Sequence, residues 1–360
     1  MSNSTRNAMT AMGFMALLAV GYVGFTFWRQ SADIDSRNAA AEERAAEFVD
    51  QLAARDIDDE EEPVDLGFDD GSEFLINRIP GDDYGRLVRR TALGDREHVG
   101  NIRCERFHAA DDNGLCLWRS GINSFKATLY DFSEGTEEEV LTWGIRLPSR
   151  ARVSRDGSFA SYTVFAEGSG YQDVSGFVTI AELFDTSNPE ERFNLFQFDH
   201  SEEDAEYFDD INSNFWGVTW GRAGEFYATW GNGEETRVIK GNFDDKTIEI
   251  LDLVGSCPSL SGDGNTLVYK KLVDEEFFLV SYDLESGEET FLNETRPVDD
   301  QVEWLDDNTI GYAIHPEGFV SDETTVQPEF DTWSLTLDGS EPELFLPNSD
   351  SPVNYQETSF

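Results

Sequence analysis

From about residue 73 onward, short apolar runs alternate along the chain with polar turns that end in Gly or Asn. Five such turns stand at 111–114 (D-D-N-G), 154–157 (S-R-D-G), 221–224 (G-R-A-G), 261–264 (S-G-D-G) and 305–308 (L-D-D-N). Their spacings are 43, 67, 40 and 44 residues. Four-stranded propeller blades recur at about 40–50 residues, and Asp-Gly between apolar runs is a strong hairpin signal. The spacing therefore predicts a β-propeller with an insertion in its longest unit, which we expect at Asp199–Asp210.

The runs around each turn follow one order, which strengthens this prediction. In the second of these units, Ala151–Val153 precedes the turn, and Phe159–Phe165, Phe177–Asp185 and Phe193–Phe198 follow it. One run before the turn and three after it recur in all five units. Four strands in each repeated unit are typical of a propeller.

A sixth unit is divided between the two ends of the repeat region. Glu73–Ile79 and Gly85–Leu93 supply two or three strands before residue 100, and Ser351–Gln356 is one spare strand at the C-terminus. Pairing the last strand with the first unit closes the ring and removes two open edges. The predicted fold is therefore all-β, a six-bladed propeller over residues 73–360 that the C-terminal strand closes.

The N-terminal part predicts a membrane anchor. Ala8–Trp28 is a run of 21 residues without charge, and about 20 apolar residues cross the hydrocarbon core as a helix. The alternative is a cleaved signal peptide, but the run exceeds the usual apolar length of about 7–15 residues and ends without a small-x-small site. We expect a cytoplasmic tail at 1–7 and an uncleaved transmembrane helix at 8–28.

Residues 29–72 are predicted to form an acidic stalk and linker. Asp35–Arg55 is rich in Ala and Glu without Gly or Pro, which favours a solvated helix. Residues 56–72 then hold nine acidic side chains around one Pro, the composition of a flexible linker. A cation site is the alternative, but the D-x-[DN]-x-[DN]-G pattern of a calcium loop is absent from this run.

Charge narrows the class of partner. The chain has 73 acidic and 26 basic residues and a formal net charge of −47. Such a surface repels a phosphate backbone and therefore excludes a nucleic-acid binder. It favours a cationic or neutral partner. With 39 % hydrophobic residues, the chain still has enough apolar material for a core.

The cysteines predict a compartment. Cys104 and Cys116 flank the turn at 111–114, and adjacent antiparallel strands bring Cβ atoms within disulfide range. We expect a Cys104–Cys116 disulfide, and hence a propeller outside the cytoplasm; two reduced thiols are the alternative. A metal site is not expected, because the four histidines fall in different units: His98, His108, His200 and His315.

Two of the units quoted above resemble a known repeat. S-R-D-G-S-F-A-S-Y and P-S-L-S-G-D-G-N-T-L-V-Y are similar to the P-x-x-S-x-D-G-x-x-[ILV]-x-[FY] repeat of TolB-like six-bladed propellers. R-C-E-R-F-H-A-A, N-F-W-G-V-T-W and T-R-P-V-D-D-Q-V-E-W-L-D-D resemble membrane-tethered TolB-like proteins of actinobacterial type. The resemblance implies the fold and its topology. TolB carries an α/β domain before its propeller, and residues 29–72 are too short and too polar for one.

Catalytic motifs do not appear in the sequence. It contains no G-x-S-x-G elbow, no P-loop and no G-x-G-x-x-G. We expect no catalytic residues and no cofactor, and we expect a binding or scaffold module that recognises an envelope protein or peptide. Abundant carboxylates leave a lyase or glycosidase in the channel open, and a lectin-like carbohydrate binder is the other alternative.

Candidate ligand-binding residues precede two innermost strands. Asn212–Gly217 and Pro297–Gln301 are expected to line one mouth of the central channel. From these segments we select Asn212, Asn214, Asp299, Asp300 and Gln301. The alternative is that these polar side chains cap strand ends while Trp216, Trp220 and Trp304 pack between blades.

Overall fold

The computed structural model describes residues 71–355 except 120–124, 144–146, 166–177, 211, 318 and 320–326. The predicted tail at 1–7, the anchor at 8–28 and nearly all of the stalk and linker at 29–72 lie outside these residues. Within the described part of the chain, no helix is long and apolar enough to cross a membrane. The membrane anchor therefore stays a prediction.

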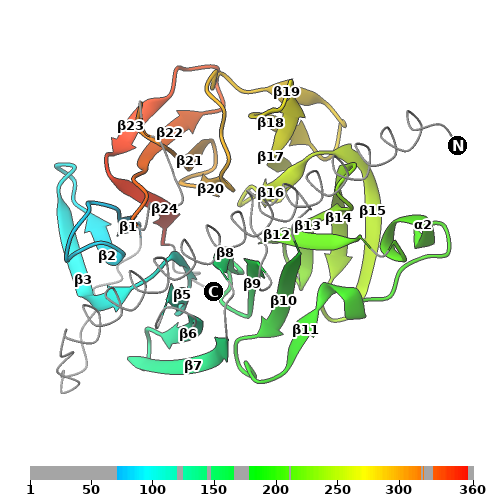
Figure 1. The fold of residues 1–360 in the computed structure, drawn as a ribbon, viewed down its shortest axis with the longest axis horizontal. Coiled ribbons are helices and arrows are strands. Elements are labelled where there is room, and N and C mark those ends of the chain that lie inside the picture. The colour runs from blue at the N-terminus through cyan, green and yellow to red at the C-terminus, as the bar shows by residue number, and fades with distance from the viewer. Residues whose placement is uncertain are drawn as a thin grey trace, which may run out of the picture. The chain divides into compact units, whose positions relative to one another are not determined.

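The described strands form six four-stranded antiparallel sheets, which Figure 1 shows as blades around a ring. From the axis outward, blade 1 contains β24 (Ser349–Asn354), β1 (Glu73–Asn77), β2 (Arg86–Arg90) and β3 (Arg96–Arg103). Blade 2 contains β4 (Arg106–Ala110), β5 (Asn113–Arg119), β6 (Phe125–Asp131) and β7 (Thr136–Trp143). Blade 3 contains β8 (Leu147–Val153), β9 (Phe159–Phe165), β10 (Thr179–Asp185) and β11 (Arg192–Asn194).

The second half of the ring repeats the order. Blade 4 contains β12 (Asn214–Trp220), β13 (Glu225–Gly231), β14 (Thr236–Asn242) and β15 (Thr247–Val254). Blade 5 contains β16 (Ser256–Leu260), β17 (Thr266–Val273), β18 (Glu276–Asp283) and β19 (Glu289–Phe291). Blade 6 contains β20 (Glu303–Trp304), β21 (Thr309–Ile314), β22 (Asp331–Thr336) and β23 (Glu343–Leu346). The predicted six-bladed propeller is confirmed.

The C-terminal strand closes the ring, as the sequence predicts. β24 pairs with β1 in antiparallel register, with Val353 opposite Phe74 and Asp350 opposite Ile76. Each innermost strand contacts the next one around the axis, and β24 contacts both β20 and β4. The first and last described strands are thus joined in blade 1.

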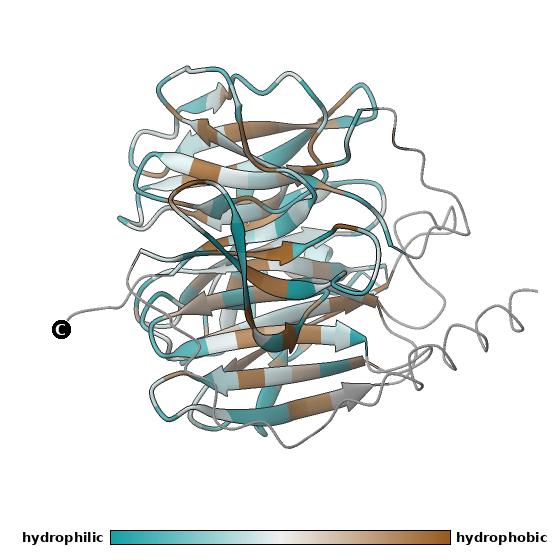
Figure 2. Cartoon of the chain, turned by 90° about the vertical axis from the view of Figure 1, so that its left-hand side faces the viewer, coloured by the Kyte–Doolittle hydropathy of each residue, from teal (hydrophilic) through white to brown (hydrophobic). Residues whose placement is uncertain are grey.

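Hydrophobic side chains within the strands build the core, and Figure 2 shows hydrophilic residues concentrated in the turns between strands. At the junction of blades 3 and 4, Trp220 stacks on Phe159 with ring centroids 5.3 Å apart. All three tryptophans are buried: Trp220 and Trp304 are 8 % exposed, and Trp216 is 7 % exposed. The burial of the three tryptophans agrees with the alternative interpretation, in which they pack between blades.

The repeated Asp-Gly turns owe their shape to a local hydrogen-bond pattern. In blade 3, the Ser154 hydroxyl donates to Asp156 Oδ1 at 2.7 Å, and the following Gly157 has φ +69°. In blade 5, the Ser261 hydroxyl donates to Asp263 Oδ1 at 2.6 Å, and Gly264 has φ +82°. Left-handed backbone at the last position explains why these turns end in Gly.

Two strands differ from the predicted runs. The run Phe193–Phe198 is not one strand, because β11 ends at Asn194 and the 3-10 helix η1 (Leu195–Gln197) follows. Asn194 Oδ1 accepts from Phe196 N at 3.0 Å, and Gln197 Oε1 accepts from Asn194 N at 2.7 Å, which caps the turn. β3 carries mostly polar residues, and its hydrophobic side chains are those of Val99 and Ile102, which are both buried. The sequence of β3 therefore shows little of the alternating pattern that indicates a strand.

Two local predictions hold. The insertion Asp199–Asp210 lies between blades 3 and 4 and contains the short helix α2 (Ala205–Phe208), whose Phe208 is buried. Cys104 and Cys116 form a disulfide with Cα atoms 5.5 Å apart, which joins the β3–β4 connection to β5.

Candidate functional site

The central channel opens into a cavity of about 570 Å³ at the end where the innermost strands finish. We call this end the turn mouth, because the turns at 155–156, 221–223 and 261–264 surround it. All six blades supply wall residues; in the order of blades 1 to 6, examples are Asn354, His108, Arg152, Trp220, Ser259 and Glu303. The volume falls within the range of about 300–1,000 Å³ that small-ligand sites occupy.

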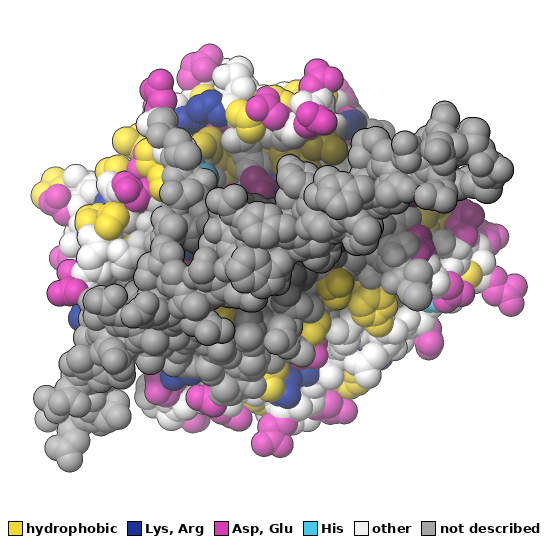
Figure 3. All heavy atoms as spheres, viewed as in Figure 1, with side chains coloured by type: hydrophobic (Ala, Val, Ile, Leu, Met, Phe, Trp, Pro, Cys, Tyr) yellow, Lys and Arg dark blue, Asp and Glu magenta, His cyan; other side chains and the backbone are white. Residues whose placement is uncertain are grey.

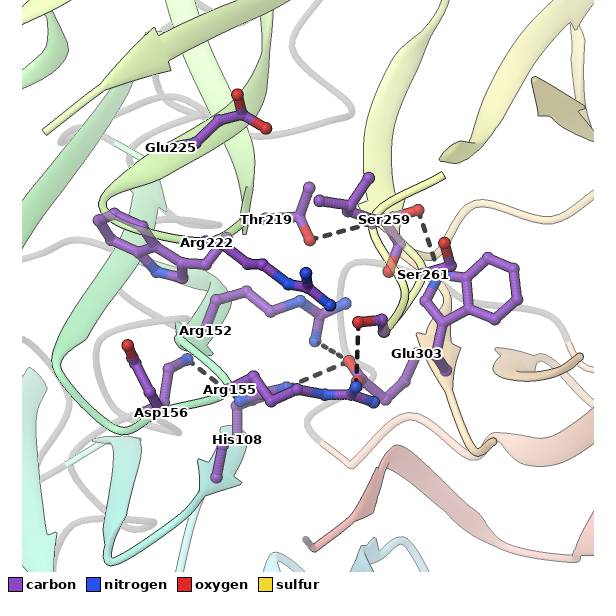
Figure 4. Close-up of a pocket in the computed structure, with 18 of the residues that line it drawn as sticks. His108, Arg152, Arg155, Asp156, Thr219, Arg222, Glu225, Ser259, Ser261 and Glu303 are labelled. Atoms are coloured by element: carbon purple, nitrogen blue, oxygen red, sulfur yellow. Dashed lines mark hydrogen bonds and ion pairs between the residues drawn. The ribbon is translucent and has the colours of Figure 1, made fainter. Parts of the chain in front are cut away.

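An ion pair across three blades forms the inner part of the cavity (Figure 4). Arg152 Nη1 lies 2.7 Å from Glu303 Oε2, and Arg152 Nη2 donates to Val302 O at 2.7 Å. His108 Nε2 lies 3.2 Å from the same Glu303 oxygen. Because His108 Nδ1 accepts from Val153 N at 3.1 Å, the ring proton of the neutral imidazole sits on Nε2, the nitrogen nearer Glu303.

The contacts with Arg152 and His108 keep the Glu303 carboxyl group ionised. Burial would raise the pKa of its carboxyl group, but the charge of Arg152 and the contact with His108 lower that pKa below its ordinary value. The negative charge of Glu303 is therefore balanced by Arg152 and faces His108 within the protein.

Arg155 reaches across the turn mouth from blade 3 to blade 5. Its Nη1 donates to Gly262 O at 3.0 Å. Gly262 holds the position in the S-G-D-G turn that Arg155 holds in S-R-D-G. A Cβ atom at residue 262 would collide with the Arg155 guanidinium group, so that group can rest on this backbone only because residue 262 is Gly.

Arg222 occupies the same position in the G-R-A-G turn of blade 4 and is exposed. Among the residues that the structure describes, its side chain has neither a hydrogen-bond partner nor an ion-pair partner. Figure 4 shows the side chains of Arg152, Arg155 and Arg222 extending in the same direction across the cavity. The turn mouth thus gathers three arginines in a chain that has few basic residues.

The other carboxylates of the wall already have partners. Glu225 Oε2 lies 2.6 Å from Lys240 Nζ. Asp156 accepts from groups of its own turn, as described above, and so does Asp263. The Ser261 hydroxyl and the Asn265 backbone N–H lower the pKa of Asp263. These carboxylates therefore stabilise the turns and flank the arginines without pairing with Arg155 or Arg222.

Two indoles give the cavity apolar wall area. Trp220 lines it from the end of β12 and Trp304 from the end of β20. Trp304 Nε1 donates to Ser259 O at 3.2 Å, which fixes that ring against blade 5. A ligand in the turn mouth meets guanidinium groups and aromatic side chains together.

The residues that the sequence selected lie at the opposite end, which we call the start mouth because the innermost strands begin there. Asp299 Oδ1 lies 2.5 Å from Lys270 Nζ, and that ammonium group lowers the pKa of the Asp299 carboxyl group below its ordinary value. Asp300 lies 3.6 Å from Arg150 and accepts from Ala313 N at 3.0 Å.

The other selected residues also hold the fold together. Gln301 is 5 % exposed, and its Nε2 donates to three carbonyl groups of blades 4 and 5, at distances of 3.1, 3.2 and 2.7 Å: Gly217, Val218 and Pro258. Asn214 Oδ1 accepts from Thr179 N at 2.9 Å, and Asn212 bonds Asp210. Ligand binding by these residues stays a prediction.

The arginines of the turn mouth were missed from the sequence, although a signal for them existed. The second turn position is Asp in blades 2 and 6 and Gly in blade 5, but it is Arg in blades 3 and 4. Two basic residues at one repeat position mark a local reversal of charge. As for metal chemistry, the described residues contain no group of three or more His, Cys, Asp and Glu placed to hold an ion.

No protein-family profile and no curated protein matches the sequence. Among solved structures, TolB from Acinetobacter baumannii is similar with a TM-score of 0.53 and 14 % identity, over 79 % of this chain and 66 % of that chain. A chain of the nidogen/laminin complex has a TM-score of 0.47 and 12 % identity, over 78 % and 97 %. Oligogalacturonate lyase in complex with manganese has a TM-score of 0.45 and 11 % identity, over 74 % of each chain.

The match with TolB concerns the fold. It supports the expected TolB-like six-bladed propeller, and this chain spans 66 % of the length of that TolB chain. At 14 % identity, activity and partners do not transfer with the fold. The membrane tether and the actinobacterial type stay predictions.

Proposed function

We propose that the propeller is a binding module that recognises a protein or peptide partner through the turn mouth. The observation that carries this proposal is the contrast between the two ends of the channel. The start mouth is crossed by contacts that hold blades together, such as those of Gln301. The turn mouth instead keeps a cavity of about 570 Å³ whose wall includes Arg222, a side chain without a partner among the described residues.

The cavity chemistry favours binding over turnover. A glycosidase needs one carboxyl group that stays protonated and acts as an acid, which requires a raised pKa. In the described wall of the cavity, the carboxyl groups with a resolved shift are Glu303 and Asp263, and both have a lowered pKa. His108 is fixed on both ring nitrogens. These groups suit an ion-paired recognition surface.

The test compares the two mouths of the channel. Gly221→Trp places an indole in the turn mouth, where a Cβ atom would first meet the flexible Glu225 side chain at 3.1 Å. Asn212→Ala alters the start mouth, where, among the described residues, the side chain bonds only Asp210. We expect Gly221→Trp to abolish capture of partners from envelope extracts by the full chain, and Asn212→Ala to leave it unchanged. The reverse result would move the site to the start mouth and contradict the proposal.

The proposal includes a place outside the cytoplasm, with residues 8–28 as the tether. The Cys104–Cys116 pair supports it, because disulfides persist in oxidising compartments. We expect non-reducing peptide mapping of protein from native membranes to recover Cys104 and Cys116 in one linked peptide pair, with Cys257 as a free thiol. Recovery of all three cysteines as free thiols would contradict this location.

A further inference from the structure

We infer that the turn mouth binds a carboxylate group of a peptide ligand, and that Arg155 and Arg222 hold it; the inference rests on the proposed function. Arg155 and Arg222 stand at the same position of neighbouring turns and line one cavity. A guanidinium group presents a planar fork of donors that matches the two oxygens of a carboxylate.

The two arginines line the cavity without a carboxylate partner among the described residues, although the chain is strongly acidic. With 73 acidic residues against 26 basic ones, a carboxylate partner is easy to supply. On the outer strands, several basic side chains have such a partner, as in the pairs Arg89–Glu97, Arg90–Glu73 and Lys271–Glu289. Figure 3 shows Asp and Glu spread around the visible edge of the molecule. In the described chain, Arg155 and Arg222 have no carboxylate partner.

The third arginine does not compete for the ligand. Arg152 is 9 % exposed and is neutralised by Glu303 at 2.7 Å. Arg155 donates from Nη1 to the Gly262 carbonyl group, which anchors it there, and its other nitrogens have no partner among the described residues. Arg222 has all of its donors available among the described residues. The pair thus offers one positioned guanidinium group and one that can adjust.

The neighbouring groups favour a singly charged ligand with an apolar part. Asp156 and Asp263 flank the arginines and would repel a doubly charged phosphate more strongly than a carboxylate. Trp220 and Trp304 provide apolar wall in the same cavity. A peptide carboxylate next to an apolar side chain satisfies both conditions, and it can come from a C-terminus or from Asp or Glu.

The experiment uses the full chain and two synthetic bead libraries of short random peptides, one with free C-terminal carboxylates and one with C-terminal amides. We expect selected peptides to carry a carboxylate and an apolar residue. Enrichment confined to the first library identifies the C-terminus as the source, and enrichment of Asp or Glu in both libraries identifies a side chain. Enrichment of basic or neutral amidated peptides, or of none, overturns the inference.

Affinities of the selected peptides then test the two residues. Removing one charge-assisted hydrogen bond to the carboxylate should weaken binding about 10-fold, so we expect Arg222→Ala and Arg155→Ala each to bind more weakly by about that factor, and the double variant about 100-fold. Arg89→Ala, which makes the same change of charge on β2, should bind like the wild-type chain. Full affinity in the double variant overturns the inference.

Gly221→Trp separates this inference from the proposal beneath it. If it abolishes peptide binding while the arginine variants bind normally, the turn mouth is the site but does not recognise a carboxylate. If it leaves binding intact, the turn mouth is not the site and the proposed function fails as well.

Discussion

A chain that ends at residue 348 is expected to lose the folded propeller. The missing segment contains β24, which is the innermost strand of blade 1 and pairs along β1. It also contains Val353 and Tyr355, which are 2 % and 1 % exposed. Burial of each such side chain contributes about 1.5–3 kcal/mol.

The same truncation removes the nearer of two carboxylate partners of a buried cation, and Glu105, at 3.4 Å, remains. Arg78 is 1 % exposed, and its Nε lies 2.8 Å from Asp350 Oδ2. Burial alone would lower the pKa of Arg78, but the Asp350 carboxylate raises it above its ordinary value, so the guanidinium stays charged. A buried charge that loses every partner costs about 3–5 kcal/mol, and because Glu105 remains we expect the loss at Arg78 to fall below about 3 kcal/mol. Together these losses rival the whole stability of a typical domain, about 5–15 kcal/mol.

The measurement is urea unfolding followed by tryptophan fluorescence. We expect the chain shortened to residue 348 to show no cooperative transition, and a synthetic peptide of residues 349–360 added in excess to restore one. A chain shortened only to residue 355 keeps β24 and should unfold like the full-length protein. A cooperative transition in the shorter chain, within about 2 kcal/mol of the full-length value, would contradict the role of β24 as ring closure.

The fold was predictable because its signals are local and repeated. In blades 3 and 5 the Asp-Gly turns specify hairpins through one Ser–Asp hydrogen bond and one left-handed Gly, and the spacing of the five turns gives five of the six blades. The spare strand at 351–356 then has one place to pair. β3 escaped detection because an outermost strand buries few of its side chains and needs no alternating pattern.

The position of the site was not predictable in the same way. Both mouths of a propeller channel carry polar residues, and the sequence does not show which side chains cross the channel. The Gln301 side chain crosses the channel and donates to carbonyl groups of two other blades. The start mouth is therefore occupied by contacts that stabilise the fold. At the turn mouth, Gly221, Ala223 and Gly262 add no large side chain to the cavity wall. Net charge also misleads, because −47 describes the whole chain and not the two arginine-bearing turns.

Replacing Glu303 by Ala is expected to lower the free energy of unfolding by about 3 kcal/mol, since it strands a buried arginine. Arg152 is 9 % exposed, and Glu303 is its carboxylate partner at 2.7 Å. Glu225→Ala is the matched control in the same cavity wall. The side chains of Glu225 and Lys240, which form an ion pair, are each about one third exposed. We therefore expect Glu225→Ala to lower the free energy of unfolding by at most about 1 kcal/mol. Equal losses in the two variants would contradict the argument from burial.

The pH dependence of this difference identifies charge as its cause. The pKa of Glu303 is lowered in the folded chain, so its ion pair contributes full stability above the unfolded-state pKa of about 4.3 and loses it as the pH falls through the lower folded-state pKa. The Glu303→Ala variant lacks that contribution at every pH. We therefore expect the gap in unfolding free energy between the wild-type chain and the variant, measured by urea titration at a series of pH values, to be constant near neutrality and to shrink below about pH 4. A gap that stays constant into acid would assign the loss to the space left by the side chain, and the Arg152–Glu303 ion pair would then have no measurable role in stability.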